Sequence, residues 1–256
     1  ILYIYMLPAW VAEHFNISSY TAAAIEVYFL AAVSLILVGR YAKDIFSENI
    51  NHARIFIVIL ACLLIFVPIN FFMERENIST ILAMPYLLFV ALRLKKIDPG
   101  SRAITILVGA LAGVAFAIKP QFVIVPICIE VVAKLCSRFK LSFFRSETWS
   151  MFAVFVCYAI SVLVFFPEYI KFFVQVVLPN YPYYGQDEII ILFLVPLVFL
   201  LSSGLVYLAH ASNKYDKLAI VLVAAGLGFV IENLITDKPW LYHYYPILVY
   251  SMLLFM

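Results

Sequence analysis

The chain alternates between apolar runs of membrane length and short polar segments. About 20 apolar residues cross the hydrocarbon core of a bilayer as a helix. Backbone groups in lipid must be satisfied within the segment, so continuous apolar runs predict helices rather than the alternating strands of a barrel. The predicted spans are residues 20–39, 53–72, 77–92, 103–118, 122–135, 149–166, 189–209 and 218–235, with a ninth beginning after Pro246.

These runs predict an all-α fold, a polytopic transmembrane helical bundle of eight to nine spans in a single domain over residues 1–256. Residues 1–19 mix apolar residues with Pro8 and Trp10, which suits an interfacial segment or the end of an earlier helix. The chain does not begin with Met and ends inside an apolar run too short to span. We therefore expect an internal piece of a longer protein.

Composition agrees with a membrane protein. Hydrophobic residues make up 66% of the chain and charged residues 12%, whereas soluble domains are about 45–50% apolar and about 25% charged. The formal net charge is +2, and no basic tail or aromatic-basic interleaving indicates nucleic acid as a partner.

Lysines and arginines fall unequally on the two sides of the predicted spans. One set of alternating loops holds thirteen of them and the opposite set holds four. The positive-inside rule places the richer set in the cytoplasm. The thirteen are Arg40, Lys43, Arg54, Arg93, Lys95, Lys96, Arg102, Lys134, Arg138, Lys140, Arg145, Lys214 and Lys217; the four are Arg75, Lys119, Lys171 and Lys238.

Three further patterns predict packing rather than chemistry. Gly109 and Gly113 lie four apart in an apolar run, which favours close approach of two helices. Glu130 and Lys134, also four apart, are typical of a structural helix pair. Asn77 is interpreted as a capping residue at the start of its helix.

The few charges on the outer side are the candidates for function. Glu74-Arg75-Glu76 and Lys119 lie in loops too short to carry charges away from the bilayer. A local ion pair between Arg75 and a neighbouring carboxylate is the structural alternative. Other charges near this side are Glu26 and Glu232 inside spans, and Asp187 and Glu188, interpreted as solvated loop charges.

These charges suit an anionic lipid substrate. Arg75 precedes a helix whose amino terminus points outward, where free N–H groups attract anions and a guanidinium matches phosphate. Lys119 and Lys238 return to the same face, so a carboxylate there could act as general base while the cations stabilise a departing phosphate. The nearby aromatic residues favour an interfacial belt, with a sugar platform as the alternative: Trp240, Tyr242, Tyr244, Tyr245 and residues 181–184.

An ordered set of short motifs carries a family resemblance over roughly Pro8 to Pro246. The motifs are the acidic-Arg-Glu segment at 74–76, Pro-Tyr-Leu-Leu at 85–88, a Gly-x-x-x-Gly helix ending in Lys119-Pro120-Gln121, and Lys-Pro-Trp-Leu-Tyr-His-Tyr-Tyr-Pro at 238–246. Their order and common sidedness resemble bacterial multi-spanning glycosyltransferases of the GT-C class, including mannosyl- and arabinosyltransferases. Members use polyprenyl-phosphate-linked sugars on the extracytoplasmic side.

The resemblance implies transfer of a sugar from a polyprenyl-phosphate-linked donor to a hydroxyl of a glycan, lipid or protein acceptor, by direct displacement at the anomeric carbon. It implies a bacterial inner-membrane protein with a periplasmic active site, with membrane lipids and partner membrane subunits as expected partners. The class admits a divalent metal ion, although no ligand spacing here indicates one. The implied catalytic residues are Glu76 and Arg75, and the implied substrate-binding residues are Glu74, Lys119, Gln121, Lys238, Tyr242 and His243.

Two departures accompany the resemblance. Many relatives carry His after the Arg-Glu pair, where this chain has Asn77. The class usually carries its main catalytic carboxylate in the first outer loop, and Glu13 matches no motif. The principal base and the first helix are therefore expected upstream of Ile1.

Two other functions remain open from the sequence. A transporter or flippase for a lipid-linked glycan would use the same outer cations but needs a polar path, for which the spans offer only Glu26, Glu130 and Glu232. A non-catalytic membrane subunit would tolerate substitution of the outer charges.

Overall fold

The computed structural model describes residues 2–47, 49–68, 72–142, 144–177, 198–199, 202–204, 216–236 and 240–255, and within these ranges it is helical, with no strand. The predicted all-α fold is confirmed. Four described helices are long and apolar enough to cross a membrane: α2 (Ser19–Ile45), α4 (Arg75–Leu94), α7 (Ser146–Phe165) and α11 (Asp216–Thr236). The full count of eight to nine spans remains a prediction.

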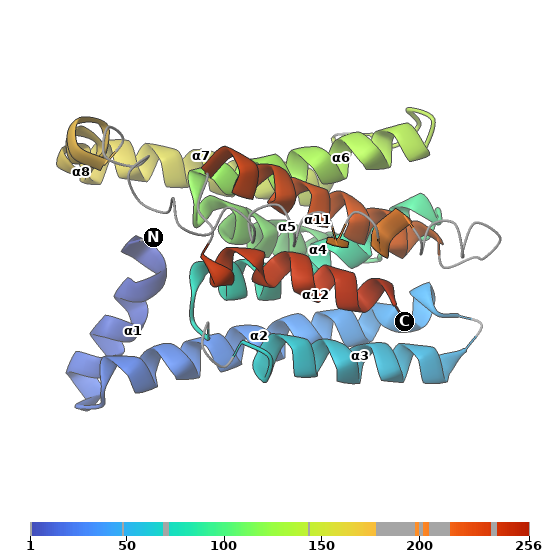
Figure 1. Ribbon diagram of the computed structural model, residues 1–256, viewed down its shortest axis with the longest axis horizontal. Coiled ribbons are helices and arrows are strands. Elements are labelled where there is room, and N and C mark those ends of the chain that lie inside the picture. The colour runs from blue at the N-terminus through green and yellow to red at the C-terminus, as the bar shows by residue number, and fades with distance from the viewer. Residues whose placement is uncertain are drawn as a thin grey trace.

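The long helices run roughly along one direction, and α1 crosses them at one end (Figure 1). Most of the predicted seventh span, and half of the loop predicted before it, lie outside the described residues. The remaining elements are α1 (Leu2–Phe15), α3 (Ile50–Ile65), α5 (Arg102–Ala117), α6 (Ile124–Cys136), α8 (Pro167–Phe172), α12 (Tyr245–Leu254), the 3-10 turns η1 (Pro120–Val123) and η5 (Leu241–Tyr244), and the π-helical turn η2 (Phe173–Val177).

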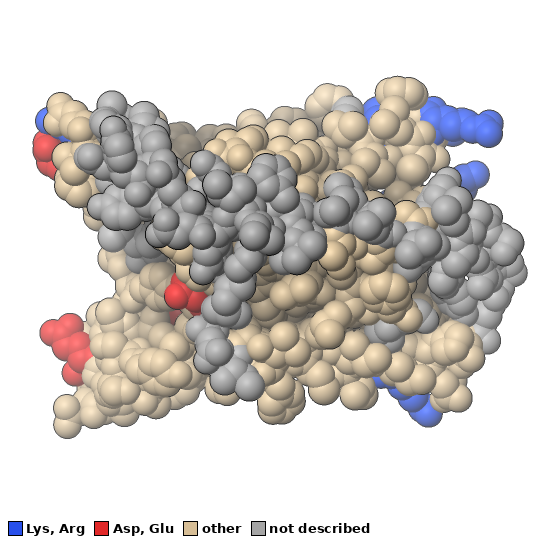
Figure 2. All heavy atoms as spheres, in the orientation of Figure 1, with Lys and Arg blue, Asp and Glu red and all other residues tan. Residues whose placement is uncertain are grey.

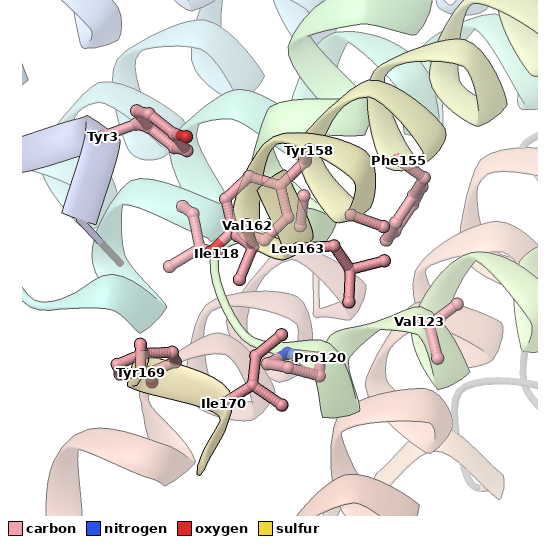
Figure 3. Close-up of a pocket in the computed structure, with 12 residues that line it drawn as sticks. Tyr3, Ile118, Pro120, Val123, Phe155, Tyr158, Val162, Leu163, Tyr169 and Ile170 are labelled. Atoms are coloured by element: carbon pink, nitrogen blue, oxygen red, sulfur yellow. The ribbon is translucent and has the colours of Figure 1, made fainter. Parts of the chain in front are cut away.

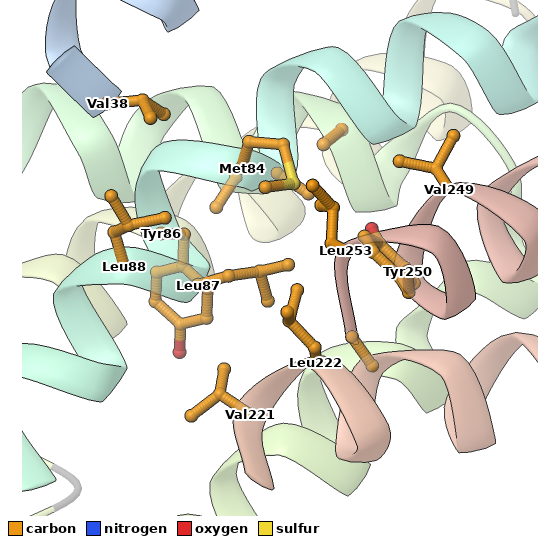
Figure 4. Packing of buried hydrophobic residues seen from close by; sticks show 14 of the residues in the cluster. Val38, Met84, Tyr86, Leu87, Leu88, Val221, Leu222, Val249, Tyr250 and Leu253 are labelled. Carbon is orange, nitrogen blue, oxygen red and sulfur yellow. The ribbon is translucent and has the colours of Figure 1, made fainter. Parts of the chain in front are cut away.

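Helix α4 is the centre of the bundle. Its residues from Glu76 to Leu92 are all buried, and it packs against α2, α5, α11 and α12. Figure 4 shows Tyr86 and Leu87 of α4 facing Leu222 of α11 and Tyr250 of α12. A helix that is covered on all sides is usually hydrophobic on all faces. Helix α4 follows this pattern beyond its first turns.

The proline inside α4 is accommodated by a neighbouring serine. Pro85 has no N–H, so the carbonyl of Ile81 loses its usual helical partner. The Ser34 hydroxyl of α2 donates a hydrogen bond to that carbonyl at 2.6 Å, in a buried position. The α2–α4 contact thereby satisfies a group that proline would leave unpaired.

The predicted close approach at Gly109 and Gly113 is confirmed. A Cβ atom at Gly109 would lie 2.1 Å from the Glu147 carbonyl oxygen, and one at Gly113 would lie 2.6 Å from Val154 Cβ. These atoms belong to α7, so α5 and α7 touch through backbone at this seam. The opposite face of α7 exposes large apolar side chains such as Phe152, as a lipid-facing helix would.

Some predicted boundaries were wrong. The span predicted over 53–72 ends as α3 at Ile65, because Pro68 cannot continue a helix and disfavours helical geometry at the residue before it. The helix predicted to begin at Asn77 begins at Arg75. The loop predicted from Pro167 starts instead with α8, whose first helical position is that proline.

The charges separate along the bundle. Figure 2 shows most of the visible Lys and Arg side chains at one end, and Asp and Glu more toward the other, where some Lys or Arg atoms also lie. The basic end includes the carboxyl end of α4 and the amino end of α5, at Arg93 and Arg102. The amino end of α4 and the residues after α5 therefore lie at the opposite end.

Candidate active site

Three buried ionisable side chains meet at the end opposite the basic one. The Lys119 ammonium donates a hydrogen bond to the Glu76 carboxylate, and its Nζ lies 3.1 Å from His243 Nε2. His243 Nε2 is 3.4 Å from Glu76 Oε1. Glu76 is 1% exposed, Lys119 5% and His243 2%. Glu76 belongs to α4, Lys119 is the residue before η1, and His243 belongs to η5. The convergence expected from sidedness is observed.

Hydrogen bonds tie the first turn of α4, and Met73 just before it, to three other segments. Asn77 donates to the Leu64 carbonyl and to the Tyr245 hydroxyl, both at 3.2 Å. The Tyr5 hydroxyl of α1 donates to the Met73 carbonyl at 2.8 Å. Burial and the nearby Glu74 carboxylate raise the pKa of Tyr5 to about 12, so this hydroxyl keeps its proton. Asn77 is thus a tie between helices rather than the predicted cap.

Local sequence directs Lys119 into the cluster. The residue before a proline is pushed to extended geometry, and Lys119 has φ −125° and ψ 132° ahead of Pro120. The chain leaves α5 there and begins η1, which turns the lysine away from the helix. An ammonium has three N–H donors, two of which are engaged by Glu76 and His243. Within the described residues no third acceptor contacts this ammonium, so one N–H can donate to an anionic ligand.

The imidazole is held by α11 and by aromatic neighbours. The Asn233 side-chain amide donates to the His243 carbonyl at 3.2 Å. The Tyr242 ring meets the His243 ring edge-on at 4.5 Å between centroids and lies 5.8 Å from Lys119 Nζ. Tyr244 is buried, so it cannot belong to the lipid-facing belt favoured from the sequence. The same holds for the buried Tyr245.

The other predicted site residues stand outside the three-residue contact. Arg75, Glu74 and Gln121 are half-buried beside it, and Lys238 lies outside the described residues. Within the described part of the chain Arg75 makes no ion pair, so the local pair considered from the sequence is not seen there. Glu76 pairs instead with Lys119 from another loop.

Sequence reasoning left Glu232 and Asn233 out of the site. Both are buried near the carboxyl end of α11. The available signal was a charged residue inside an apolar span, since such residues usually face the bundle interior. Which side of α11 they occupy was not readable from the apolar run.

An apolar pocket of about 480 Å³ is lined in part by the residues on either side of Lys119. It lies between α1, the end of α5, η1, α7 and α8, and Figure 3 shows Ile118 and Pro120 beside Tyr158 and Ile170. Ile118 and Pro120 flank Lys119 in sequence. Lys119 itself is not among the lining residues, because its ammonium turns to Glu76 and His243.

The basic end holds a separate buried network. Arg145 donates to the Glu130 carboxylate, which also accepts from the Tyr86 hydroxyl. Glu147 accepts from Arg93 and lies 3.5 Å from Arg145 Nε. Glu130 thus pairs with Arg145, which lies outside its own helix. This network joins α4, α6 and α7.

The described residues contain no group of three His, Cys, Asp or Glu side chains close enough to hold a metal ion. Glu76 has one such residue beside it, His243, and its carboxylate is paired with Lys119.

Apolar spans surrounding a buried ionic cluster define an all-helical membrane protein with a candidate site at one end. Over residues 2–254 the sequence matches glycosyltransferase family 87. The chain belongs to that family and is a membrane glycosyltransferase. Comparison with curated proteins and with solved structures gives no match. The family favours the enzyme over the transporter and non-catalytic alternatives.

Proposed function

We propose that this protein is a GT-C-like enzyme that transfers a sugar from a polyprenyl-phosphate-linked donor to a hydroxyl of a glycan, lipid or protein. The proposal depends on one observation: the buried Lys119 is held by Glu76 and His243, and the residues on either side of it, Ile118 and Pro120, line an apolar pocket. A lipid phosphate needs a cation for its head and apolar surface for its chain.

The reaction is a direct displacement. The bond between the anomeric carbon and the phosphate oxygen breaks, and the acceptor oxygen bonds to that carbon. The hydroxyl proton passes to a carboxylate base, and polyprenyl phosphate leaves with the bonding electrons. Lys119, with Arg75 one residue before Glu76, stabilises the developing phosphate charge. Glu76 and His243 keep the ammonium in position.

We place this chemistry on the extracytoplasmic face of a bacterial inner membrane. The support is the separation of charge, since Lys and Arg gather at the opposite end of the bundle. Acceptors of this class, such as lipid-linked glycans, wall polymers and proteins, also occur on that face.

Transfer from labelled donors tests the proposal. Purified protein is incubated with radiolabelled polyprenyl-phosphate mannose, arabinose or glucose and a panel of alkyl glycosides, and conversion of acid-labile lipid label to acid-stable glycoside is measured. Lys119→Ala and Arg75→Ala should lower transfer by about 10²–10³-fold, the typical effect of removing one charge-stabilising donor. Lys171→Ala is the matched control, because that lysine is 64% exposed and pairs with Glu168.

Normal transfer by Lys119→Ala would refute the role given to the lysine. Failure of the wild-type protein to consume any of the polyprenyl-phosphate sugars would refute the donor class.

A further inference from the structure

Glu232 is a buried carboxylate that the displacement does not use. It lies four residues before the end of α11 and is 1% exposed. Within the described residues neither carboxylate oxygen accepts a hydrogen bond. Buried polar atoms in folded proteins almost always have partners, because an unpartnered one is costly. Glu232 therefore faces a place where a hydrogen-bond donor belongs.

That place borders the Lys119 cluster. Helix α11 packs against α4, η1 and η5, which carry or adjoin Glu76, Lys119 and His243, and the charges of Lys119, Glu76 and Arg75 act on the Glu232 carboxylate. The next residue, Asn233, holds the His243 carbonyl, which fixes this turn of α11 against η5. The turn of α11 that carries Glu232 is thus held next to η5.

The charge balance selects the kind of donor. A metal cation would be attracted by Glu76 and Glu232 but repelled by Lys119 and Arg75, and the described residues offer it no group of three ligands; an anion would be repelled by Glu232 itself. A neutral polyol is repelled by neither, and the two carboxylate oxygens can accept from two neighbouring hydroxyls. A sugar joined to the phosphate through one oxygen carries its hydroxyls beside the lysine that holds the phosphate.

We infer that Glu232 accepts hydrogen bonds from hydroxyl groups of the donor sugar and forms a sugar subsite beside the phosphate site at Lys119. The inference rests on the proposed function. It makes Glu232 a residue that recognises the sugar and leaves recognition of the lipid phosphate to the cations.

Binding of two lipids separates these roles. The affinity of the purified full chain is measured for polyprenyl phosphate without sugar and for the same lipid carrying mannose or arabinose. Wild type should bind a sugar-bearing lipid more tightly. Glu232→Gln should weaken binding of that lipid by about 10- to 100-fold, the effect of losing charged hydrogen bonds, and leave the affinity for polyprenyl phosphate unchanged. Glu26→Gln, a half-buried glutamate in α2, is the matched control and should change neither.

Glu232→Met serves as a second variant, because it replaces the carboxylate with an apolar side chain of similar length. The inference is overturned if a folded variant keeps the sugar affinity, if both lipids weaken equally, if neither sugar adds affinity in wild type, or if neither variant folds. A wild-type protein that does not bind polyprenyl phosphate at all refutes the proposed function and this inference with it.

Discussion

The pairing of Glu76 with Lys119 allows stability and chemistry to be separated in one double-mutant cycle. The two side chains are 1% and 6% exposed, so each charge depends on the other for compensation. Lys119→Met leaves the Glu76 carboxylate buried without its cation, and Glu76→Gln leaves the ammonium without its carboxylate. Breaking a buried pair from one side costs about 3–5 kcal/mol of unfolding free energy.

The double variant Glu76→Gln/Lys119→Met should behave differently. Replacing both members of a buried pair is often neutral, so most of the lost free energy should return and the cycle should show a favourable interaction energy. Transfer should not return, because the phosphate would still lack its cation; it should stay about 10²–10³-fold low. A stable and inactive double variant is the expected result.

Unfolding in detergent and transfer from a labelled donor are measured on all four proteins. Recovery of transfer together with stability in the double variant would show that the pair is only structural, and the reasoning would fail. Asp98→Asn is the control at an exposed pair, since Asp98 is 78% exposed and pairs with Arg93 at the basic end. It should change stability by no more than about 1 kcal/mol.

Three further predictions concern the scaffold and are checked by unfolding in detergent. Gly109→Ala puts a methyl group 2.1 Å from a carbonyl oxygen of α7 and should cost about 1–3 kcal/mol or more, whereas Gly39→Ala, 3.6 Å from its nearest neighbour, should be neutral or slightly stabilising. Ser34→Ala removes the donor to the carbonyl left free by Pro85 and should cost about 1–3 kcal/mol. The pKa of Tyr5 is raised to about 12, so its stabilising contribution should be complete below its ordinary pKa near 10 and lost as pH rises through 12; Tyr5→Phe should remove that pH dependence.

Apolar run length predicted most of the described helices, and the deviations have local causes. The expected run over 103–118 corresponds to α5 at Arg102–Ala117, and that over 149–166 to α7 at Ser146–Phe165. Hydropathy does not take into account that proline lacks a backbone N–H. The predicted second span therefore continued past Pro68 to residue 72. Hydropathy also could not show that Asn77 bonds to α3 and α12, because those partners are distant in sequence.

The site was predictable as a face but not as a set of contacts. Sidedness placed Glu76, Lys119 and His243 at one end, and the structure brings them together. A helix turns about 100° per residue, so adjacent residues face different directions. Glu76 consequently points into the bundle while Arg75 stays half-buried. The same rotation decides what Glu232 faces; its charge within an apolar run indicated an interior position, but the run did not indicate which neighbours it would meet.

The two ends of the bundle differ in how completely their carboxylates are partnered. At the basic end Glu130 and Glu147 each accept hydrogen bonds from an arginine. At the other end Glu76 Oε2 and both oxygens of Glu232 accept none within the described residues. A purely structural network tends toward full satisfaction, since each missing bond in a low-dielectric interior weakens the fold. Carboxylate oxygens near Lys119 that lack protein partners are expected where a bound polar substrate donates the missing hydrogen bonds. This difference between the two ends therefore supports chemistry at the Lys119 end.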